Sequence, residues 1–284
     1  MKIISAHSKD LGDNFFVRRA IPQIGTKSIG PFVFVDHFGP TTIVKGKEMT
    51  VRAHPHIGLA TITYLYAGGI LHRDSLGTEI EIKPFEVNWM TAGKGIVHSE
   101  RSAPFETSMP LQGIQTWVAL PKEHEETEPE FFHYKADQIP VSQNDGVTLR
   151  VIAGEYQNQL SPVKVYSSLF YCDVEMQAGK EVRWQAKKGQ QTGVYVSIGQ
   201  IQIKGQTLQV GDLAILEPEE ELQMTSELES RLVVFGGDPF PEKRHLFWNF
   251  VSSSPEKIEQ AKTDWQQRKF PAVPNETEFI PLPE

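Results

Sequence analysis

Short runs in which hydrophobic and polar residues alternate, each closed by glycine or proline, fill most of this chain. The alternation is clear over residues 61–66, 79–83 and 114–120. Successive side chains of a strand point to opposite faces, so these runs predict short strands with one buried face. Many short strands separated by turn residues predict an all-β fold of the sandwich or barrel type.

The second half of the chain repeats the pattern of the first. Residues 64–68 resemble 195–199, and residues 85–90 resemble 211–216, with an alternating run between the two in each case. We therefore predict two tandem β-barrels built from one duplicated unit. Residues 1–135 are expected to form the first barrel, and residues 136–284 the second barrel together with a C-terminal helix and tail.

The helix is predicted from capping and periodicity near the C-terminus. Ser254 before Pro255 is typical of a helix start, because a serine side chain can accept a hydrogen bond from a free backbone N–H and proline suits the first turn. Ile258, Ala261 and Trp265 share one helical face, which we expect to dock on a barrel. The helix should end before Pro271.

Two pairs of polar residues carry the candidate chemistry: His54 with His56, and His98 with Glu100. Residues i and i+2 of a strand share a face, so each pair projects together. If the two strands are neighbours, three imidazoles and one carboxylate converge as ligands for a divalent transition metal. A closed structural zinc site is the alternative, but such sites favour cysteine-rich sets, so we expect open coordination positions.

The second half lacks the residues to rebuild this site. The positions that correspond to His98 and Glu100 fall near Met224 and Ser226, and of the nine histidines only His245 lies beyond position 133. The first barrel is therefore expected to carry the metal and the second to serve as scaffold.

The composition of the chain limits its expected binding partners and its cellular compartment. The net charge is −8 and no basic stripe occurs, which argues against direct binding of nucleic acid. Cys172 is the one cysteine, so no internal disulfide can form and a reducing compartment is favoured. Residues 1–17 lack the apolar core of a signal peptide, and no stretch reaches the roughly 18–20 apolar residues of a membrane span. We expect a cytoplasmic protein that does not contact the membrane.

Several motifs resemble the pirin family of the cupin superfamily, over about residues 5–240. They are His54-Pro55-His56-Ile57-Gly58, Trp89-Met90-Thr91-Ala92-Gly93-Lys94-Gly95-Ile96-Val97-His98-Ser99-Glu100, Leu111-Gln112-Gly113-Ile114-Gln115-Thr116-Trp117-Val118, and the segment from Pro31-Phe32 to Asp36-His37-Phe38. The resemblance implies a bicupin, in which each barrel is a double-stranded β-helix, with one metal in the N-terminal barrel. It implies His54, His56, His98 and Glu100 as the four ligands.

The resemblance also implies iron(II) as the expected metal, with Zn, Ni, Mn, Co or Cu as alternatives. Several members oxygenate the flavonol quercetin, and the animal protein is associated with transcriptional regulation. One departure is Ala60, where many pirins place a glutamate, so Glu100 is the one obvious acid near the predicted site.

Three functions follow from these expectations. The first is a quercetin 2,3-dioxygenase-type enzyme acting on an aromatic enol and oxygen, with Glu100 as both ligand and catalytic proton acceptor. The second is a regulatory protein without turnover, whose metal occupancy or redox state alters contacts with a protein partner. The third is a β scaffold that the metal only stabilises.

Other polar residues carry weaker expectations. Gln115 and Trp117 share a strand face and either line the pocket or belong to the ordinary barrel lining. Asp36 and His37 either gate the pocket mouth or are structural, the commoner role for a lone histidine beside a strand end. His72, within the segment 72–77, is expected in a solvated turn.

Overall fold

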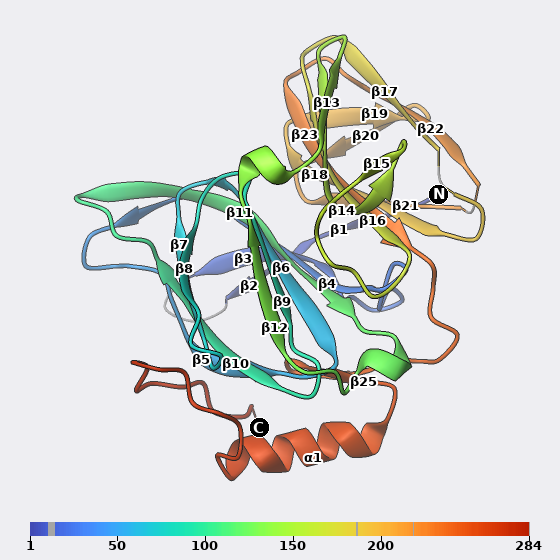
Figure 1. Ribbon diagram of the computed structural model, residues 1–284. Coiled ribbons are helices and arrows are strands. Elements are labelled where there is room, and N and C mark those ends of the chain that lie inside the picture. The colour runs from blue at the N-terminus through green and yellow to red at the C-terminus, as the bar shows by residue number, and fades with distance from the viewer. Residues whose placement is uncertain (11–14, 186, 218, 284) are drawn as a thin grey trace. The chain divides into compact units, whose positions relative to one another are not determined.

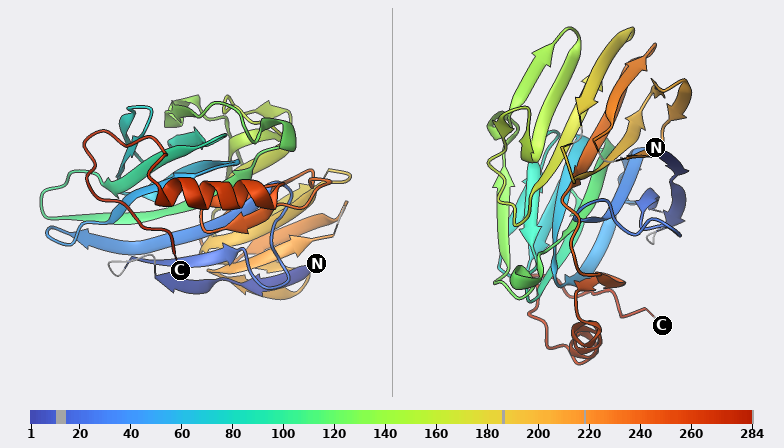
Figure 2. Two further views of the ribbon diagram at one scale, coloured as in Figure 1. Left: turned by 90° about the horizontal axis from the view of Figure 1, so that it is seen from below. Right: turned by 90° about the vertical axis from the view of Figure 1, so that its right-hand side faces the viewer.

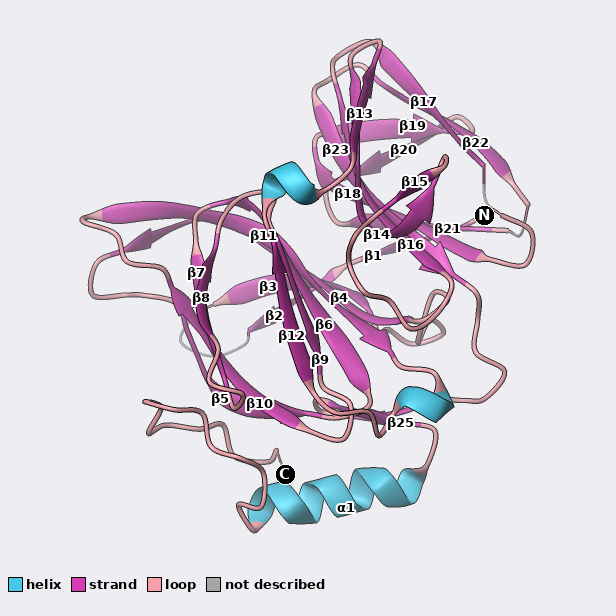
Figure 3. Ribbon diagram, in the orientation of Figure 1, coloured by secondary structure: helices cyan, strands magenta, loops and turns pink. Residues whose placement is uncertain are grey.

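The computed structural model describes residues 1–10, 15–185, 187–217 and 219–283, and strands account for most of them (Figures 1 and 3). Contacts divide the chain into two units. The histidine unit consists of Lys9–Val17, Phe38–Ala136 and Pro241–Glu284, and the second unit of Met1–Ser8, Arg18–His37 and Asp137–Phe240. The chain is thus not divided into consecutive halves. Its C-terminal helix, which the sequence placed with the second barrel, belongs to the histidine unit.

The histidine unit is built on two antiparallel sheets. One has the strand order β12-β9-β6-β11-β4-β3-β2, of which β2, β3 and β4 each have part of their residues in the second unit, and the other has the order β5-β10-β7-β8. The strands are β2 (His7–Asp10), β3 (Phe16–Ile21), β4 (Phe32–Val44), β5 (Thr50–His56), β6 (Leu59–Ala67), β7 (Ile70–Asp74), β8 (Glu79–Ile82), β9 (Val87–Thr91), β10 (Ile96–Ser102), β11 (Ser108–Ala119) and β12 (Glu130–Tyr134).

The second unit repeats this arrangement of two sheets, with the additional strand β15 and with β1, from the start of the chain, in the edge position that β12 takes in the histidine unit. Its sheets have the orders β1-β21-β18-β23-β16-β14-β13, with β15 on β14, and β17-β22-β19-β20. The strands are β1 (Lys2–Ser5), β13 (Val141–Asn144), β14 (Val147–Tyr156), β15 (Gln159–Leu160), β16 (Leu169–Met176), β17 (Lys180–Gln185), β18 (Gln191–Ile198), β19 (Gln200–Ile203), β20 (Gln206–Gln209), β21 (Asp212–Leu216), β22 (Glu221–Ser226) and β23 (Ser230–Gly237). The predicted duplication is confirmed.

The remaining elements are short, apart from one helix. They are the 3₁₀ turns Lys122–His124 and Ala136–Gln138, the hairpin strands β24 (His245–Phe247) and β25 (Phe250–Ser252), and α1 (Pro255–Gln266). Within the described residues no helix is both long and apolar enough to cross a bilayer.

Helix α1 begins as the sequence predicts. Ser254 caps it by accepting a hydrogen bond from the Lys257 backbone N–H at 3.4 Å, and Pro255 opens the first turn. Ile258, Ala261 and Trp265 are buried in a cluster with apolar residues of β5, β10 and β25. Figure 2 shows α1 lying against the histidine unit. Burial of this apolar stripe fixes the helix, because an isolated helix of 12 residues is marginal in water.

Candidate metal centre

Three histidines converge in the interior of the histidine unit. His54 and His56 lie on β5, and the antiparallel partner β10 places His98 directly opposite His54. One ring nitrogen from each residue lies within 4.8 Å of the other two. All three side chains are buried, and His56 Nε2 is 3.0 Å from His98 Nε2. The predicted convergence of the three imidazoles is confirmed.

Glycine turns set the direction of these two strands. Gly58, just after β5, has φ +67°, and a Cβ there would lie 1.9 Å from the Val251 carbonyl oxygen. Gly93, just before β10, has φ +51°, and its carbonyl accepts from the Gly58 N–H at 2.8 Å. Both backbone conformations are costly for any residue with a side chain. The turns therefore hold the ends of β5 and β10 together and bring the histidines into register.

Burial keeps the three imidazoles neutral. Removal from water lowers the pKa of His54 to about 4, and it lowers the pKa of His56 and of His98 well below the ordinary value, with repulsion among the rings adding to the effect. His54 Nδ1 donates to the Arg52 carbonyl at 2.8 Å, which leaves its Nε2 with a lone pair. Neutral imidazoles with a free lone pair are the form that binds metals.

The donor set fits a divalent transition metal. Two nitrogens bound to one ion at about 2.1 Å and at right angles lie about 3.0 Å apart. The separation of His56 Nε2 and His98 Nε2 matches this value. Imidazole ligands suit iron, nickel, copper and zinc, and no cysteine contributes to the group. The three histidines that the sequence singled out therefore lie close enough together to hold such an ion.

Glu100 is not a member of this three-histidine group. The ladder between β10 and β5 shifts register between His98 and Glu100, so Glu100 lies opposite Val51 instead of Arg52. Glu100 Oε1 lies 3.5 Å from Thr63 Oγ1, while that hydroxyl makes a shorter contact of 2.8 Å with Gln115. Burial raises the pKa of the Glu100 carboxyl, and the neighbouring His72 partly offsets the rise. Its role as fourth ligand stays a prediction.

Gln115 and Trp117 of β11 lie close to the three-histidine group and to Glu100. The pairing of β11 with β6 places Gln115 opposite Thr63 and Trp117 opposite Thr61, so both side chains lie on one face. The Trp117 ring is 5.1 Å from the His56 ring and meets it edge to face. These contacts favour the pocket-lining alternative for Gln115 and Trp117.

The expectation for His72 was wrong. His72 belongs to β7, is 3% exposed and lies beside His98, with 3.5 Å between their Nδ1 atoms. Asp74, two residues on, is completely buried. In β7 the side chains of Ile70, His72 and Asp74 are buried and alternate with more exposed residues. The sequence of this segment shows no such alternation of apolar and polar residues, and the turn residues Ser75 and Gly77 follow it directly.

In the second unit apolar residues occupy the positions equivalent to the three histidines. The pairing of β17 with β22 sets Val182 opposite Met224 and Trp184 opposite Leu222, which matches His54 opposite His98 and His56 opposite Ile96 in the histidine unit. Trp184, Leu222 and Met224 are fully buried in the core of this unit. In the described part of this unit, core side chains thus fill the positions equivalent to His54, His56 and His98.

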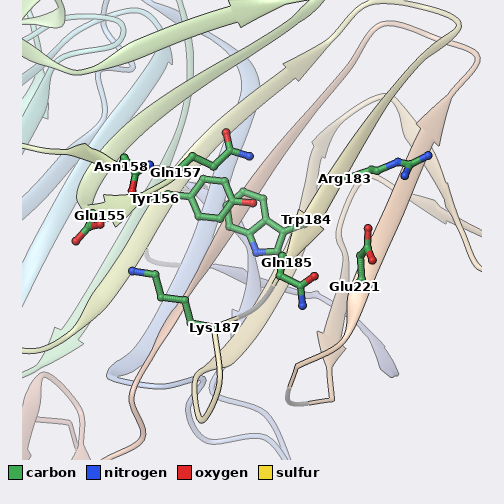
Figure 4. Close-up of a pocket in the computed structure, with 9 residues that line it drawn as sticks. All are labelled: Glu155, Tyr156, Gln157, Asn158, Arg183, Trp184, Gln185, Lys187 and Glu221. Carbon is green, nitrogen blue, oxygen red and sulfur yellow. The ribbon is translucent and has the colours of Figure 1, made fainter.

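A cavity of about 410 Å³ lies in the second unit, and Figure 4 labels the residues that line it. At its base Tyr156 stacks on Trp184, with ring centroids 3.7 Å apart. Burial raises the pKa of Tyr156 to about 12, so its phenol stays protonated. Asp36 and His37 are both buried, and Asp36 forms an ion pair with Arg19 while His37 contacts the Tyr195 hydroxyl. These contacts favour the structural alternative for the two residues.

The duplicated two-sheet topology, with a buried histidine cluster in one copy and an apolar core in the other, is that of a two-domain cupin protein. Residues 14–118 match the Pirin family, and residues 171–271 match the Pirin C-terminal cupin domain. The chain belongs to the pirin family, as its motifs indicated.

Relatives that match over most of their length support this assignment. A pirin-like protein of Caulobacter vibrioides is 43% identical, and the similarity covers 99% of each chain. Human pirin is 30% identical over 89% of this chain and 87% of its own. The crystal structure of a quercetin 2,3-dioxygenase from Acinetobacter baumannii superposes with a TM-score of 0.94 at 31% identity, covering 100% of this chain and 95% of that one.

Proposed function

We propose that this protein is a metal-dependent dioxygenase that acts on a flavonol or a similar aromatic enol. One observation carries the proposal: three buried, neutral imidazoles direct ring nitrogens at one point. The similarity to a solved structure described as quercetin 2,3-dioxygenase, which covers 95% of that chain, supports the choice of substrate class. Iron(II) is the metal we expect, and the cytoplasm is the expected compartment.

His54, His56 and His98 would hold the ion without adding negative charge to it. A bound divalent ion would supply a Lewis-acid position that lowers the pKa of the enol hydroxyl and leaves room for oxygen. Glu100, as fourth ligand and base, would accept the hydroxyl proton at a carboxylate oxygen. Thr63 bridges Glu100 and Gln115 and so would limit the positions open to that carboxylate.

Trp117 would form an aromatic wall beside the metal ligands. Its ring meets that of His56 edge to face, at 5.1 Å between centroids. Aromatic pairs in such arrangements contribute about 0.5–1.5 kcal/mol beyond the area that they bury. A planar aromatic substrate beside Trp117 would gain similar contacts while its hydroxyl faced Glu100.

Oxygen consumption on quercetin tests the proposal. The protein is loaded with Fe(II) without oxygen, its metal content is measured by elemental analysis, and uptake is then followed with an oxygen electrode. His56→Ala and Glu100→Gln should each reduce turnover at least 100-fold. His133→Phe is the matched control, because this histidine contacts Asn88 and Glu86 instead of the cluster and should leave turnover unchanged.

The outcomes separate the candidate functions. Equal turnover by His56→Ala and the unchanged protein would reject the assigned site. Full metal occupancy without oxygen uptake on a broad panel of phenols would reject the enzyme and favour the regulatory role. A large fall in melting temperature on chelation, with no exchangeable coordination position, would favour a structural metal.

A further inference from the structure

A second pair of buried polar residues lies beside the candidate metal centre and has no part in the proposed function. His72 and Asp74 occupy β7, which pairs with β10 so that Asp74 lies opposite His98 and His72 opposite Glu100. Residues directly opposite each other in a ladder share a face, so this pair faces the same interior as His98. Their exposed fractions are 3% for His72 and zero for Asp74. Burial of a carboxylate costs free energy unless hydrogen-bond or ionic partners offset the loss of water.

The partners form a continuous chain from the backbone to the cluster. Asp74 Oδ1 accepts from the N–H groups of Leu76 and Thr78, at 2.9 and 3.1 Å. Its Oδ2 lies 3.0 Å from His72 Nε2, and His72 Nδ1 lies 3.5 Å from His98 Nδ1. The other nitrogen of His98, Nε2, is the atom that lies 3.0 Å from His56 Nε2.

This order of contacts allows one arrangement of protons for neutral rings. A carboxylate can only accept, so His72 carries its proton on Nε2 and donates to Asp74. His72 Nδ1 is then an acceptor, and it can receive the Nδ1 proton of His98. His98 Nε2 is left with a lone pair directed at the cluster, which is the state that a metal ligand requires.

Packing holds the middle ring of the chain in place. The ring of Phe131, on β12, stacks on His72 with 4.4 Å between centroids and 23° between planes. His54 on β5 and His98 on β10, which are the proposed ligands on facing strands, are oriented by different groups. His54 is held by a backbone carbonyl, that of Arg52, whereas His98 depends on two side chains.

We propose that His72 and Asp74 are positioning residues that fix the tautomer and ring orientation of His98 for metal binding. The inference rests on the proposed metal centre. It adds to that centre a series of contacts that runs from Asp74 through His72 to His98. Partners of this kind raise the basicity of a ligating imidazole, and their loss typically weakens metal affinity 10–100-fold.

Two substitutions break the chain in different ways. Asp74→Asn keeps the size of the side chain, and its oxygen can still accept from Leu76 and Thr78. Its amide group would then donate to His72 Nε2, which moves the His72 proton to Nδ1 and opposes the required tautomer of His98. His72→Phe removes the acceptor for His98 while preserving an aromatic ring against Phe131.

Calorimetric titration of this protein with Ni²⁺, after removal of bound metal, measures the effect. Each single variant should raise the Ni²⁺ dissociation constant at least 10-fold, while His133→Phe should not change it. The double variant should bind no more weakly than His72→Phe alone, because Asp74 acts only through His72. Circular dichroism and melting temperature of the metal-free proteins check that each variant is folded.

The outcomes distinguish failure of the positioning role from failure of the proposed metal centre. If the unchanged protein does not bind Ni²⁺, the proposed metal centre itself fails. If it binds and Asp74→Asn binds equally well, or the two substitutions act additively, the positioning role is overturned and the metal centre stands.

A measurement without substitutions covers the case in which the variants do not fold. Nitrogen-15 chemical shifts of labelled histidines distinguish the two tautomers in the unchanged protein loaded with Zn²⁺. We expect His72 protonated on Nε2 and His98 protonated on Nδ1. A His72 ring protonated on Nδ1 would overturn the inference.

Discussion

Replacement of Glu276 by glutamine should loosen the C-terminal tail from the sheet that carries His98. The Glu276 carboxylate accepts from Arg101 Nε and Nη2 at 3.0 and 2.5 Å, from Ser99 Oγ at 2.9 Å and from Arg73 Nη1 at 3.3 Å. Its side chain is 3% exposed. Arg73 lies on β7 and the other two partners on β10, so one tail residue ties both strands to the tail.

The magnitude follows from the ionisation of Glu276. Hydrogen bonds from Arg101, followed by those from Ser99 and the charge of Arg101, lower the pKa of its carboxyl from 4.5 to about 2. Such a shift is equivalent to about 3.4 kcal/mol of stabilisation at neutral pH. Arg101 and Arg73 are 28% and 24% exposed, so solvent screens part of the attraction. We expect Glu276→Gln to cost about 2 kcal/mol.

Urea unfolding at pH 7, followed by tryptophan fluorescence, measures this cost. Trp265 reports on the tail directly, because its indole N–H donates to the Ile280 carbonyl at 3.0 Å. Glu278→Gln is the matched control, since Glu278 interacts with the charge of Arg101 but is exposed. The control should change the free energy of unfolding by less than about 0.5 kcal/mol.

The pH dependence gives a second, independent arm. A carboxyl with a lowered pKa stabilises the folded state fully above pH 4.5, and the contribution is lost as the pH falls towards 2. Roughly 60% of it should be gone by pH 3. The difference between the unchanged protein and Glu276→Gln should shrink accordingly. An effect no larger than that of Glu278→Gln, or a difference that is the same at pH 7 and pH 3, would refute the reasoning.

Three further predictions concern the turns, the second unit and the metal. Gly58→Ala should lower the free energy of unfolding by roughly 2 kcal/mol or more, because the new Cβ would collide with the Val251 carbonyl. Gly77→Ala, at φ +88° in open space, should lower it by roughly 1 kcal/mol. Equal losses in thermal or urea unfolding would contradict the collision. Trp184→Ala should destabilise the protein by about 3–5 kcal/mol through the cavity it leaves, yet leave the Ni²⁺ dissociation constant of folded protein unchanged; weaker Ni²⁺ binding would contradict the scaffold role of the second unit. Ni²⁺ at 100 times its dissociation constant should stabilise the folded state by about 2.7 kcal/mol, with a matching rise in melting temperature that chelation reverses; an unchanged melting temperature would show that the ion does not bind the folded state.

The sequence was sufficient to identify the three histidines and the helix. Both rest on local geometry, because residues i and i+2 of a strand share a face and a capped helix repeats every 3.6 residues. His54, His56 and the stripe of Ile258 and Trp265 could therefore be recognised without knowledge of their partners. The apolar counterpart of the site was also readable, since Met224 stands where the duplication pairs it with His98.

Tertiary structure alone decided which distant segments meet. The interpretation of His72 and Asp74 failed because nothing local to β7 shows that β10 lies beside it. The tail reaches the same sheet through Glu276, about 175 residues after Ser99 and Arg101. Which strands pair over such separations depends on which apolar faces can be buried against each other. Every strand of this chain with one apolar face offers a similar face, so the sequence does not single out the correct pairing. Periodicity reveals which face of an element is buried, but only the folded chain determines what lies against that face.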